Sequence, residues 1–231
     1  MSAAQAPERA LPGLTFRDRW RSRIEPIARG FGRIGLTPNA LTLIGFGIAL
    51  VAAFLATERS WLAAGVLVMV GAVFDLFDGA LARATGKTTK FGAFLDSTMD
   101  RWGEAVVYVG LAIGIGEVGF SIGMPLAAAA MASAFMVSYV RAKSESLGFT
   151  PGHGMASVGL APREVRIVIL TVGLIGAGIL SSQEAEGRMM FYPLWYIVLV
   201  GSLALITVLA TITTIQRIFH VYREAKKQEQ Q

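Results

Sequence analysis

The stretch that decides the fold runs from Asp75 to Asp100 and reads DLFDGALARATGKTTKFGAFLDSTMD. It carries four aspartates between two long apolar segments: Asp75, Asp78, Asp96 and Asp100. A carboxylate inside a membrane helix costs about 2.5 kcal/mol or more at the bilayer centre, so it normally faces a partner, a cavity or an ion path. A shared divalent cation is the simplest explanation for four such groups in one short segment.

The spacing of these aspartates predicts two helices that each present a pair of carboxylates. Asp75 and Asp78 are three residues apart, and Asp96 and Asp100 are four apart, so each pair shares one helix face. The polar, glycine-containing segment 84–90 between them is typical of a tight connection. We therefore expect the two helices to be antiparallel neighbours whose carboxylate pairs face each other. Ligands that are all oxygen favour Mg²⁺, Mn²⁺ or Ca²⁺ over zinc.

The same stretch resembles the signature of the CDP-alcohol phosphotransferases, also called CDP-alcohol phosphatidyltransferases. That signature is Asp-x-x-Asp-Gly-x-x-Ala-Arg, eight residues, and then Gly-x-x-x-Asp-x-x-x-Asp. The chain matches every fixed position in identity and spacing: Asp75, Asp78, Gly79, Ala82, Arg83, Gly92, Asp96 and Asp100. The residues alone leave one alternative, a structural polar network buried in a helix bundle.

The resemblance implies a reaction and a role for each matching residue. These enzymes move a phosphatidyl group, or a related phosphoalcohol, from a CDP-linked donor to an acceptor hydroxyl and release CMP. Asp75, Asp78 and Asp96 would hold a pair of Mg²⁺ or Mn²⁺ ions. Asp100 would be the catalytic general base on the acceptor hydroxyl and a further metal ligand. The nucleotide pocket would be lined by Gly79, Ala82, Arg83 and Gly92.

A second short element stands just before the first apolar span. Pro38, Asn39 and Thr42 resemble a Pro-Asn-x-x-Thr element that many family members carry at this place. The resemblance implies that Asn39 or Thr42 borders the nucleotide. The residues alone are equally consistent with a plain helix start, in which Thr37 caps the helix and Pro38 lies in its first turn.

Length and composition predict an all-α integral membrane bundle. The chain has 231 residues and a mean hydropathy of +0.56. Its hydrophobic share, 54%, exceeds that of a typical soluble domain. Six apolar segments have roughly the twenty residues needed to cross a bilayer. These predicted transmembrane helices are 39–56, 61–84, 90–115, 122–144, 163–180 and 192–219. They make one membrane domain, 38–219, followed by a charged cytoplasmic tail, 220–231. The lack of cysteine excludes disulfides and cysteine metal sites.

The N-terminal segment 1–37 is expected to lie on the cytoplasmic side of the membrane domain. From Leu14 to Ile34, apolar residues mostly recur every three or four positions, and arginines fill much of the remainder. This pattern predicts an amphipathic juxtamembrane helix on an anionic membrane surface, and the alternative is a solvated helix packed on a partner domain. No short apolar run with a small-residue cleavage site precedes the first span, so we expect no cleavable signal peptide.

Positive charge is distributed unevenly, and this predicts the orientation in the membrane. Of the 21 Lys and Arg residues, all but Arg59, Arg101 and Arg188 lie on one predicted side. By the positive-inside rule that side is cytoplasmic, so we expect a multi-pass protein of the cell membrane whose active site faces the cytoplasm. The same bias accounts for the net charge of +5 without a nucleic-acid partner.

Basic residues at the cytoplasmic ends of the later spans indicate an acceptor that carries phosphate. The strings SYVRAK at 138–143 and QR at 216–217 resemble segments of actinobacterial phosphatidylinositol-phosphate synthases, in which basic residues bind the phosphate of inositol phosphate. The resemblance implies that Arg141, Arg166 and Arg217 do so here. The chain departs from that subfamily where Arg141 replaces a lysine and where APREVR at 161–166 replaces Glu-Arg-Pro-Glu-Arg. Each arginine is equally consistent with a positive-inside anchor.

We therefore expect a membrane transferase with CDP-diacylglycerol as donor and a phosphorylated polyol as acceptor. Inositol 1-phosphate is favoured, and phosphatidylglycerophosphate synthase, which uses glycerol 3-phosphate, is the alternative within the family. The resemblance also implies a homodimer embedded among membrane lipids. An alternative from a different functional class is a divalent-cation channel or transporter, which would use the aspartates as its ion path. This alternative gives no role to Gly79, Ala82 and Arg83. A lipid-binding scaffold would give the metal site no purpose.

Overall fold

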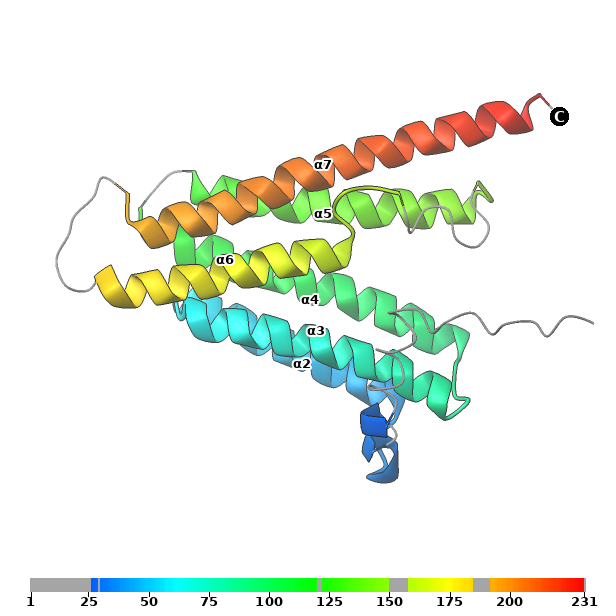
Figure 1. Ribbon diagram of the computed structural model, residues 1–231, viewed down its shortest axis with the longest axis horizontal. Helices are drawn as coiled ribbons and strands as arrows, with labels where there is room; N and C mark the ends of the chain where they lie inside the picture. The colour runs from blue at the N-terminus through cyan, green and yellow to red at the C-terminus, as the bar shows by residue number, and fades with distance from the viewer. Residues whose placement is uncertain (1–25, 29, 120–121, 150–157, 185–191, 231) are drawn as a thin grey trace, which may run out of the picture.

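The computed structural model describes residues 26–28, 30–119, 122–149, 158–184 and 192–230, and all regular secondary structure in these ranges is helical. Six long helices carry the fold: α2 (Pro38–Thr57), α3 (Trp61–Ala84), α4 (Lys90–Gly116), α5 (Gly123–Ser146), α6 (Arg163–Glu184) and α7 (Leu194–Gln228) (Figure 1). The prediction of an all-α chain is therefore confirmed for the described residues.

The helix bounds follow the predicted spans closely, with one extension. Helix α7 continues past Phe219 to Gln228, so most of the predicted tail 220–231 is helical. The predicted amphipathic helix from Leu14 to Ile34 falls largely on residues 1–25, outside the described residues. Of the remainder, residues 26–28 and 30–33 are helical.

Local capping chemistry sets where the first helices begin and turn. Thr37 Oγ1 accepts a hydrogen bond of 3.2 Å from the N–H of Ala40, and Pro38 occupies the first turn of α2, as predicted. Thr89 Oγ1 accepts a bond of 2.9 Å from the N–H of Gly92 and so caps α4. The short connection between α3 and α4 turns at Gly86, whose φ of +65° suits glycine.

The six helices form a closed ring in which each packs against two others. The order around the ring is α2, α3, α6, α7, α5 and α4, which returns to α2. Helix α2 therefore separates α3 from α4, although these two are joined by a short turn. This corrects the expectation that the two aspartate helices are nearest neighbours. Small residues on α2 let it lie against both, since Gly45 faces Asp75 on α3 and Ala49 faces Gly103 on α4.

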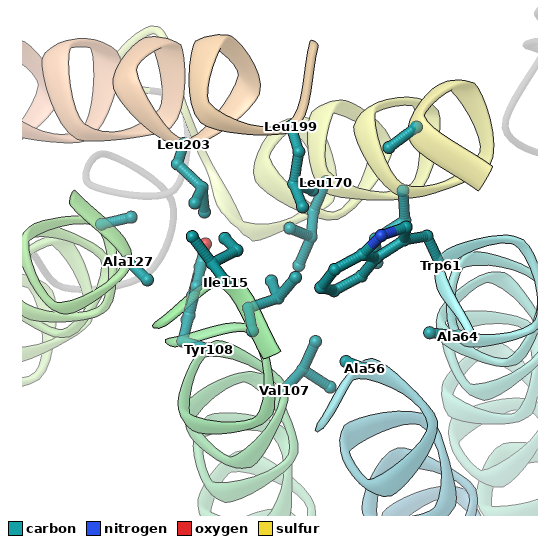
Figure 2. Packing of buried hydrophobic residues seen from close by; sticks show 14 of the residues in the cluster. Ala56, Trp61, Ala64, Val107, Tyr108, Ile115, Ala127, Leu170, Leu199 and Leu203 are labelled. Carbon is teal, nitrogen blue, oxygen red and sulfur yellow. The ribbon is translucent and has the colours of Figure 1, made fainter. Parts of the chain in front are cut away.

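The apolar core fills the interior of the ring away from the aspartates and takes side chains from all six helices. Figure 2 shows Trp61 of α3, Tyr108 of α4, Leu170 of α6 and Leu203 of α7 directed into a common interior. Helices α2 and α4 approach each other closely beside this core. A Cβ atom added at Gly110 would clash with the carbonyl oxygen of Ala53, so the two helices touch backbone to backbone, as small residues allow in membrane bundles.

Five of the described helices are long and apolar enough to cross a membrane, namely α2, α3, α5, α6 and α7. Large apolar side chains face outward from them, for example Phe54 at 62% exposure and Val172 at 64%. Helix α4 is as long, but it carries Asp100, Arg101 and Glu104 near its middle. Of these, Asp100 and Glu104 line a pocket of the site described next.

Candidate active site

The four aspartates lie toward the turn that joins α3 to α4, and this turn is at the right-hand side of Figure 1. Asp75 and Asp78 lie one turn apart in the second half of α3, and Asp96 and Asp100 lie one turn apart in the first half of α4. The Asp100 carboxylate lies within electrostatic range of the other three, and Asp96 lies within range of Asp75 and Asp78. The structure thus brings together the four carboxylates that the sequence singled out.

Asp78 is the most buried of the four, with 4% of its surface exposed. The hydroxyl of Thr42, in the second turn of α2, donates a hydrogen bond of 2.7 Å to Asp78 Oδ2. Thr42 thus contacts one of the four aspartates, and the cap of α2 is Thr37 rather than Thr42. Helix α2 packs against both α3 and α4, and this position brings the Thr42 hydroxyl to the Asp78 carboxylate.

Arg163, the first residue of α6, bridges one carboxylate from each aspartate helix. Its Nη2 lies 2.7 Å from Asp75 Oδ2, and its Nη1 lies 2.8 Å from Asp100 Oδ2. The sequence patterns grouped Arg163 with other basic residues at helix ends and did not name it as a site residue. Its position in the first turn of a helix was the signal in the sequence that pointed to it. A cation there lies near the positive end of the helix dipole, which is unfavourable, so it needs acidic partners.

Two pockets open beside the carboxylates and share Thr42. The first, the interior pocket, is lined by Asp75, Asp100 and Arg163 and continues toward the core between apolar side chains of α2, α3, α4 and α6. These apolar residues include Ala49, Leu67, Val68, Ile167 and Leu170. The interior pocket therefore joins a charged end to an apolar one.

The second, the hairpin pocket, lies between the start of α2, the end of α3 and the start of α4, and it contains Asp78 and Asp96. It is lined by all six residues predicted to contact a nucleotide: Asn39, Thr42, Gly79, Ala82, Arg83 and Gly92. Asn39 lies directly over Gly92, where an added Cβ would be 3.2 Å from Asn39 Oδ1. A side chain at this glycine would narrow the pocket.

The donor set suits a hard divalent cation, since it consists of carboxylates and the Thr42 hydroxyl, and the chain has no cysteine. Among the described residues, no three acidic or histidine side chains are arranged to coordinate an ion as they stand. Instead, the guanidinium of Arg163 contacts Asp75 and Asp100. The positively charged Arg163 guanidinium already lies between carboxylates of α3 and α4. These carboxylates therefore suit a divalent cation at the same position.

A buried ion pair joins α6 to α4 one turn after Arg163. It is formed by Arg166 and Glu104. Arg166 Nε and Nη2 each donate a hydrogen bond of 2.8 Å to the Glu104 carboxylate, and Nη1 donates one of 3.1 Å to the carbonyl of Ala161. The Arg166 side chain is 1% exposed and that of Glu104 is 7% exposed. Arg166, predicted to bind an acceptor phosphate, would have to exchange these partners to do so.

The other two arginines predicted to bind the acceptor lie on α7 and α5. Arg217 is 3% exposed and donates hydrogen bonds to the carbonyls of Val158, at 3.0 Å, and Val137, at 2.7 Å. Arg141 is exposed and pairs with Glu145 one turn later, at 2.9 Å. Arg217 lies within electrostatic range of both Arg141 and Arg166. Arg166 in turn lies within range of Arg163, which pairs with two of the aspartates, so the three arginines gather toward the aspartate end of the ring.

A profile of the family described as CDP-alcohol phosphatidyltransferase matches residues 35–208. The chain belongs to this family. It is accordingly a transferase of phospholipid biosynthesis, and its apolar helices make it a multi-pass membrane protein. Membership of the CDP-alcohol phosphatidyltransferases confirms the resemblance read from the stretch Asp75–Asp100, and it argues against the channel and scaffold alternatives.

Two curated relatives within the CDP-alcohol phosphatidyltransferases are named for inositol phosphate lipids. An archaetidylinositol phosphate synthase of Pyrococcus horikoshii is 35% identical over 92% of this chain and 95% of its own length. A phosphatidylinositol phosphate synthase of Cutibacterium acnes is 33% identical over 90% of this chain and 96% of its own. The two names differ in the lipid, archaetidyl or phosphatidyl, and both contain inositol phosphate.

A solved CDP-alcohol phosphatidyltransferase has the same fold. The phosphatidylinositol phosphate synthase of Mycobacterium tuberculosis in complex with manganese and citrate superposes with a TM-score of 0.71 at 28% identity, covering 86% of this chain and 88% of that one. The same enzyme with CDP-diacylglycerol bound gives a TM-score of 0.70 at 28% identity, covering 86% and 93%. These relatives agree with the subfamily resemblance of the strings at 138–143 and 216–217.

Proposed function

We propose that the chain transfers a phosphatidyl group from CDP-diacylglycerol to an inositol phosphate, forming phosphatidylinositol phosphate and releasing CMP. The observation that carries this proposal is the hairpin pocket, in which every residue predicted to contact a nucleotide lies beside two of the four carboxylates. The two curated relatives named for inositol phosphate lipids support the acceptor. No feature of the described residues favours glycerol 3-phosphate.

In this proposal the CDP group lies in the hairpin pocket. Gly79 and Gly92 leave room for the nucleotide to pack on the backbone, and Asn39 borders it from the start of α2. Arg83 and Lys87 line the same pocket and neutralise part of the charge of the pyrophosphate.

The transfer itself needs a base beside the acceptor hydroxyl. We assign this role to Asp100, which lines the interior pocket within electrostatic range of the other three aspartates. Asp100 takes the proton as the acceptor oxygen bonds to the phosphorus that carries diacylglycerol, and the bond from that phosphorus to CMP breaks. Mg²⁺ or Mn²⁺, as a pair of ions held by Asp75, Asp78, Asp96 and Asp100, would stabilise the negative charge on the attacking and leaving oxygens.

The acceptor phosphate is assigned to the end of the ring where Arg141, Arg166 and Arg217 gather. Arg141 is the most accessible of these and can meet a phosphate directly, because its one ion pair is exposed. Arg166 and Arg217 are buried and already bonded, so they act through their positive field or by exchanging partners. Both contributions favour an acceptor that carries phosphate over free inositol or serine.

Helix α4 is proposed as a sixth membrane span beside the five apolar helices. It closes the ring between α2 and α5, and its later half contributes Val107, Tyr108 and Leu111 to the core. With six spans, the positive-inside bias places the aspartates and both ends of the chain on the cytoplasmic side of the cell membrane. The division into 1–37, 38–219 and 220–231, and the homodimer, rest on the sequence pattern and the resemblance.

Release of CMP by the purified protein tests the proposed function. CDP-diacylglycerol and Mg²⁺ are supplied with inositol 1-phosphate, glycerol 3-phosphate, serine or inositol in separate reactions. We expect release with inositol 1-phosphate alone, loss of activity in EDTA and recovery on adding Mg²⁺ or Mn²⁺. Release only with glycerol 3-phosphate would show that glycerol 3-phosphate is the acceptor, and it would leave the proposed donor site unchanged. Full activity in EDTA would remove the metal from the proposal.

A further inference from the structure

Arg163 lies at the position where the proposed function places a divalent cation. One guanidinium nitrogen contacts Asp75 of α3 at 2.7 Å, and the other contacts Asp100 of α4 at 2.8 Å. The guanidinium therefore connects the two aspartate helices, each of which packs mainly on α2 rather than on the other. A single cation from a third helix satisfies one carboxylate on each.

The charge balance of the site explains why such a cation is needed. Four carboxylates lie within mutual electrostatic range, and their repulsion grows when they leave water. Among the described residues, Arg163 is the one basic side chain that forms an ion pair with any of them. Asp78 receives only the neutral hydroxyl of Thr42 among the side-chain hydrogen bonds of the described residues. Without metal, Arg163 supplies the positive charge that the site requires.

The start of α6 is fixed, which sets where the Arg163 side chain begins. Thr213 Oγ1 accepts hydrogen bonds from the N–H groups of Leu160, at 3.0 Å, and Ala161, at 2.9 Å. Arg166 Nη1 holds the carbonyl of Ala161 from the other side. The Nε of Arg163 itself is buried and has no hydrogen-bond partner within the described part of the chain. The side chain is thus held by its two carboxylates and not by a complete polar network.

We propose that Arg163 is an internal counter-ion of the metal-free enzyme, which holds Asp75 and Asp100 together until a divalent cation displaces it. This inference rests on the proposed function, since it takes the aspartates to be the metal ligands. Arg163 and the cation compete for the same two carboxylate oxygens. Displacement needs only a rotation of a long side chain that is 29% exposed, because the backbone on which it stands is anchored.

Metal affinity and metal-free stability together test this inference. Purified wild-type protein, Arg163→Gln and Arg163→Lys are titrated with Mn²⁺, and each is melted in EDTA and in saturating Mn²⁺. We expect Arg163→Gln to bind Mn²⁺ about tenfold more tightly and to melt at a lower temperature in EDTA, with Mn²⁺ removing most of that deficit. Arg163→Lys should fall between the two, because an ammonium lacks the planar fork that reaches both carboxylates.

A matched control separates local competition from a change in net charge. Arg223→Gln removes one positive charge from an exposed residue of α7 and should leave Mn²⁺ affinity unchanged. If Arg163→Gln does not yield folded protein, the same shift in Mn²⁺ affinity is read from Arg163→Lys. Unchanged or weaker Mn²⁺ binding in both Arg163 variants, with the same loss of stability in EDTA and in Mn²⁺, would make Arg163 a structural residue and overturn the inference alone. Absence of Mn²⁺ binding by the wild-type protein would overturn both the inference and the proposed metal site.

Discussion

The hydroxyl of Thr42 on α2 donates a hydrogen bond of 2.7 Å to the buried carboxylate of Asp78 on α3. This contact joins the Pro-Asn-x-x-Thr element to the aspartate signature, which the sequence separates by most of α2, a turn and the first half of α3. Both residues line the hairpin pocket. Helix α2 therefore lines the pocket beside Asp78 in addition to packing against α3 and α4.

Replacing Thr42 by valine tests the contribution of this hydrogen bond. Valine keeps the shape of threonine and removes the donor, so a buried carboxylate loses an interaction worth about 1.5–3 kcal/mol. We expect CMP release to fall by about tenfold or more in Thr42→Val, while Thr42→Ser keeps most of the activity. Activity and melting temperature are measured together. Unaltered turnover in the valine variant would show that Asp78 does not need this donor.

Asp100→Asn separates the proposed chemistry from donor binding. The amide is nearly isosteric with the carboxylate but cannot accept the proton of the acceptor hydroxyl. We expect turnover to fall by roughly 100-fold or more, the usual contribution of a general base, while CDP-diacylglycerol binding largely survives. Binding is followed by the rise in melting temperature that CDP or the donor lipid produces. Near-normal turnover would assign the base to another residue.

The buried pair between Glu104 and Arg166 makes a prediction about stability. Glu104→Gln leaves a guanidinium that is 1% exposed without its anion, so we expect a loss of about 3–5 kcal/mol of unfolding free energy. The double variant Glu104→Leu with Arg166→Met should recover much of this loss, because paired removal leaves no buried charge. The measurement is denaturant or thermal unfolding in detergent. Equal stability of Glu104→Gln and wild type would show that water or another group reaches Arg166.

Gly110→Ala tests the close contact between α2 and α4. The added methyl group would clash with the carbonyl oxygen of Ala53, so the helices must separate, at a cost of about 1–3 kcal/mol. Gly201→Ala on α7 is the matched control, since nothing lies within 4 Å of a Cβ there. That control should be neutral or more stable, because alanine favours helix. A lower melting temperature in both variants would point to a general effect of the substitution.

Arg141→Gln tests the assignment of the acceptor phosphate. We expect the KM for inositol 1-phosphate to rise by about tenfold and the KM for CDP-diacylglycerol to change little, because the loss of one charge-assisted contact falls on the acceptor. Glu145→Gln is the matched control, since it breaks the same exposed ion pair and keeps the arginine. Equal changes in both KM values would indicate a structural or orienting role for Arg141.

Much of the site was predictable because its residues lie close together in the sequence. The i, i+3 and i, i+4 spacing of the aspartates predicts one face for each pair, and the structure places both pairs at the same end of the ring. The residues predicted to contact a nucleotide likewise come from two short strings, and these converge in the hairpin pocket. Arg163 was not singled out, because its partners lie far away in sequence and only packing brings them within 3 Å.

Local periodicity and short-range spacing were enough to predict the six helices, the acidic signature and the family, although α7 runs past its predicted end at Phe219 to Gln228. Only the tertiary structure decided the order of helices around the ring, which inserts α2 between two helices that a short turn connects. It also decided which charges meet, pairing Arg163 with Asp75 and Asp100 and burying Arg166 against Glu104. The physical reason is that helix order follows from the shapes of distant faces, here glycine and alanine surfaces that allow backbones to touch, and no local pattern records those contacts.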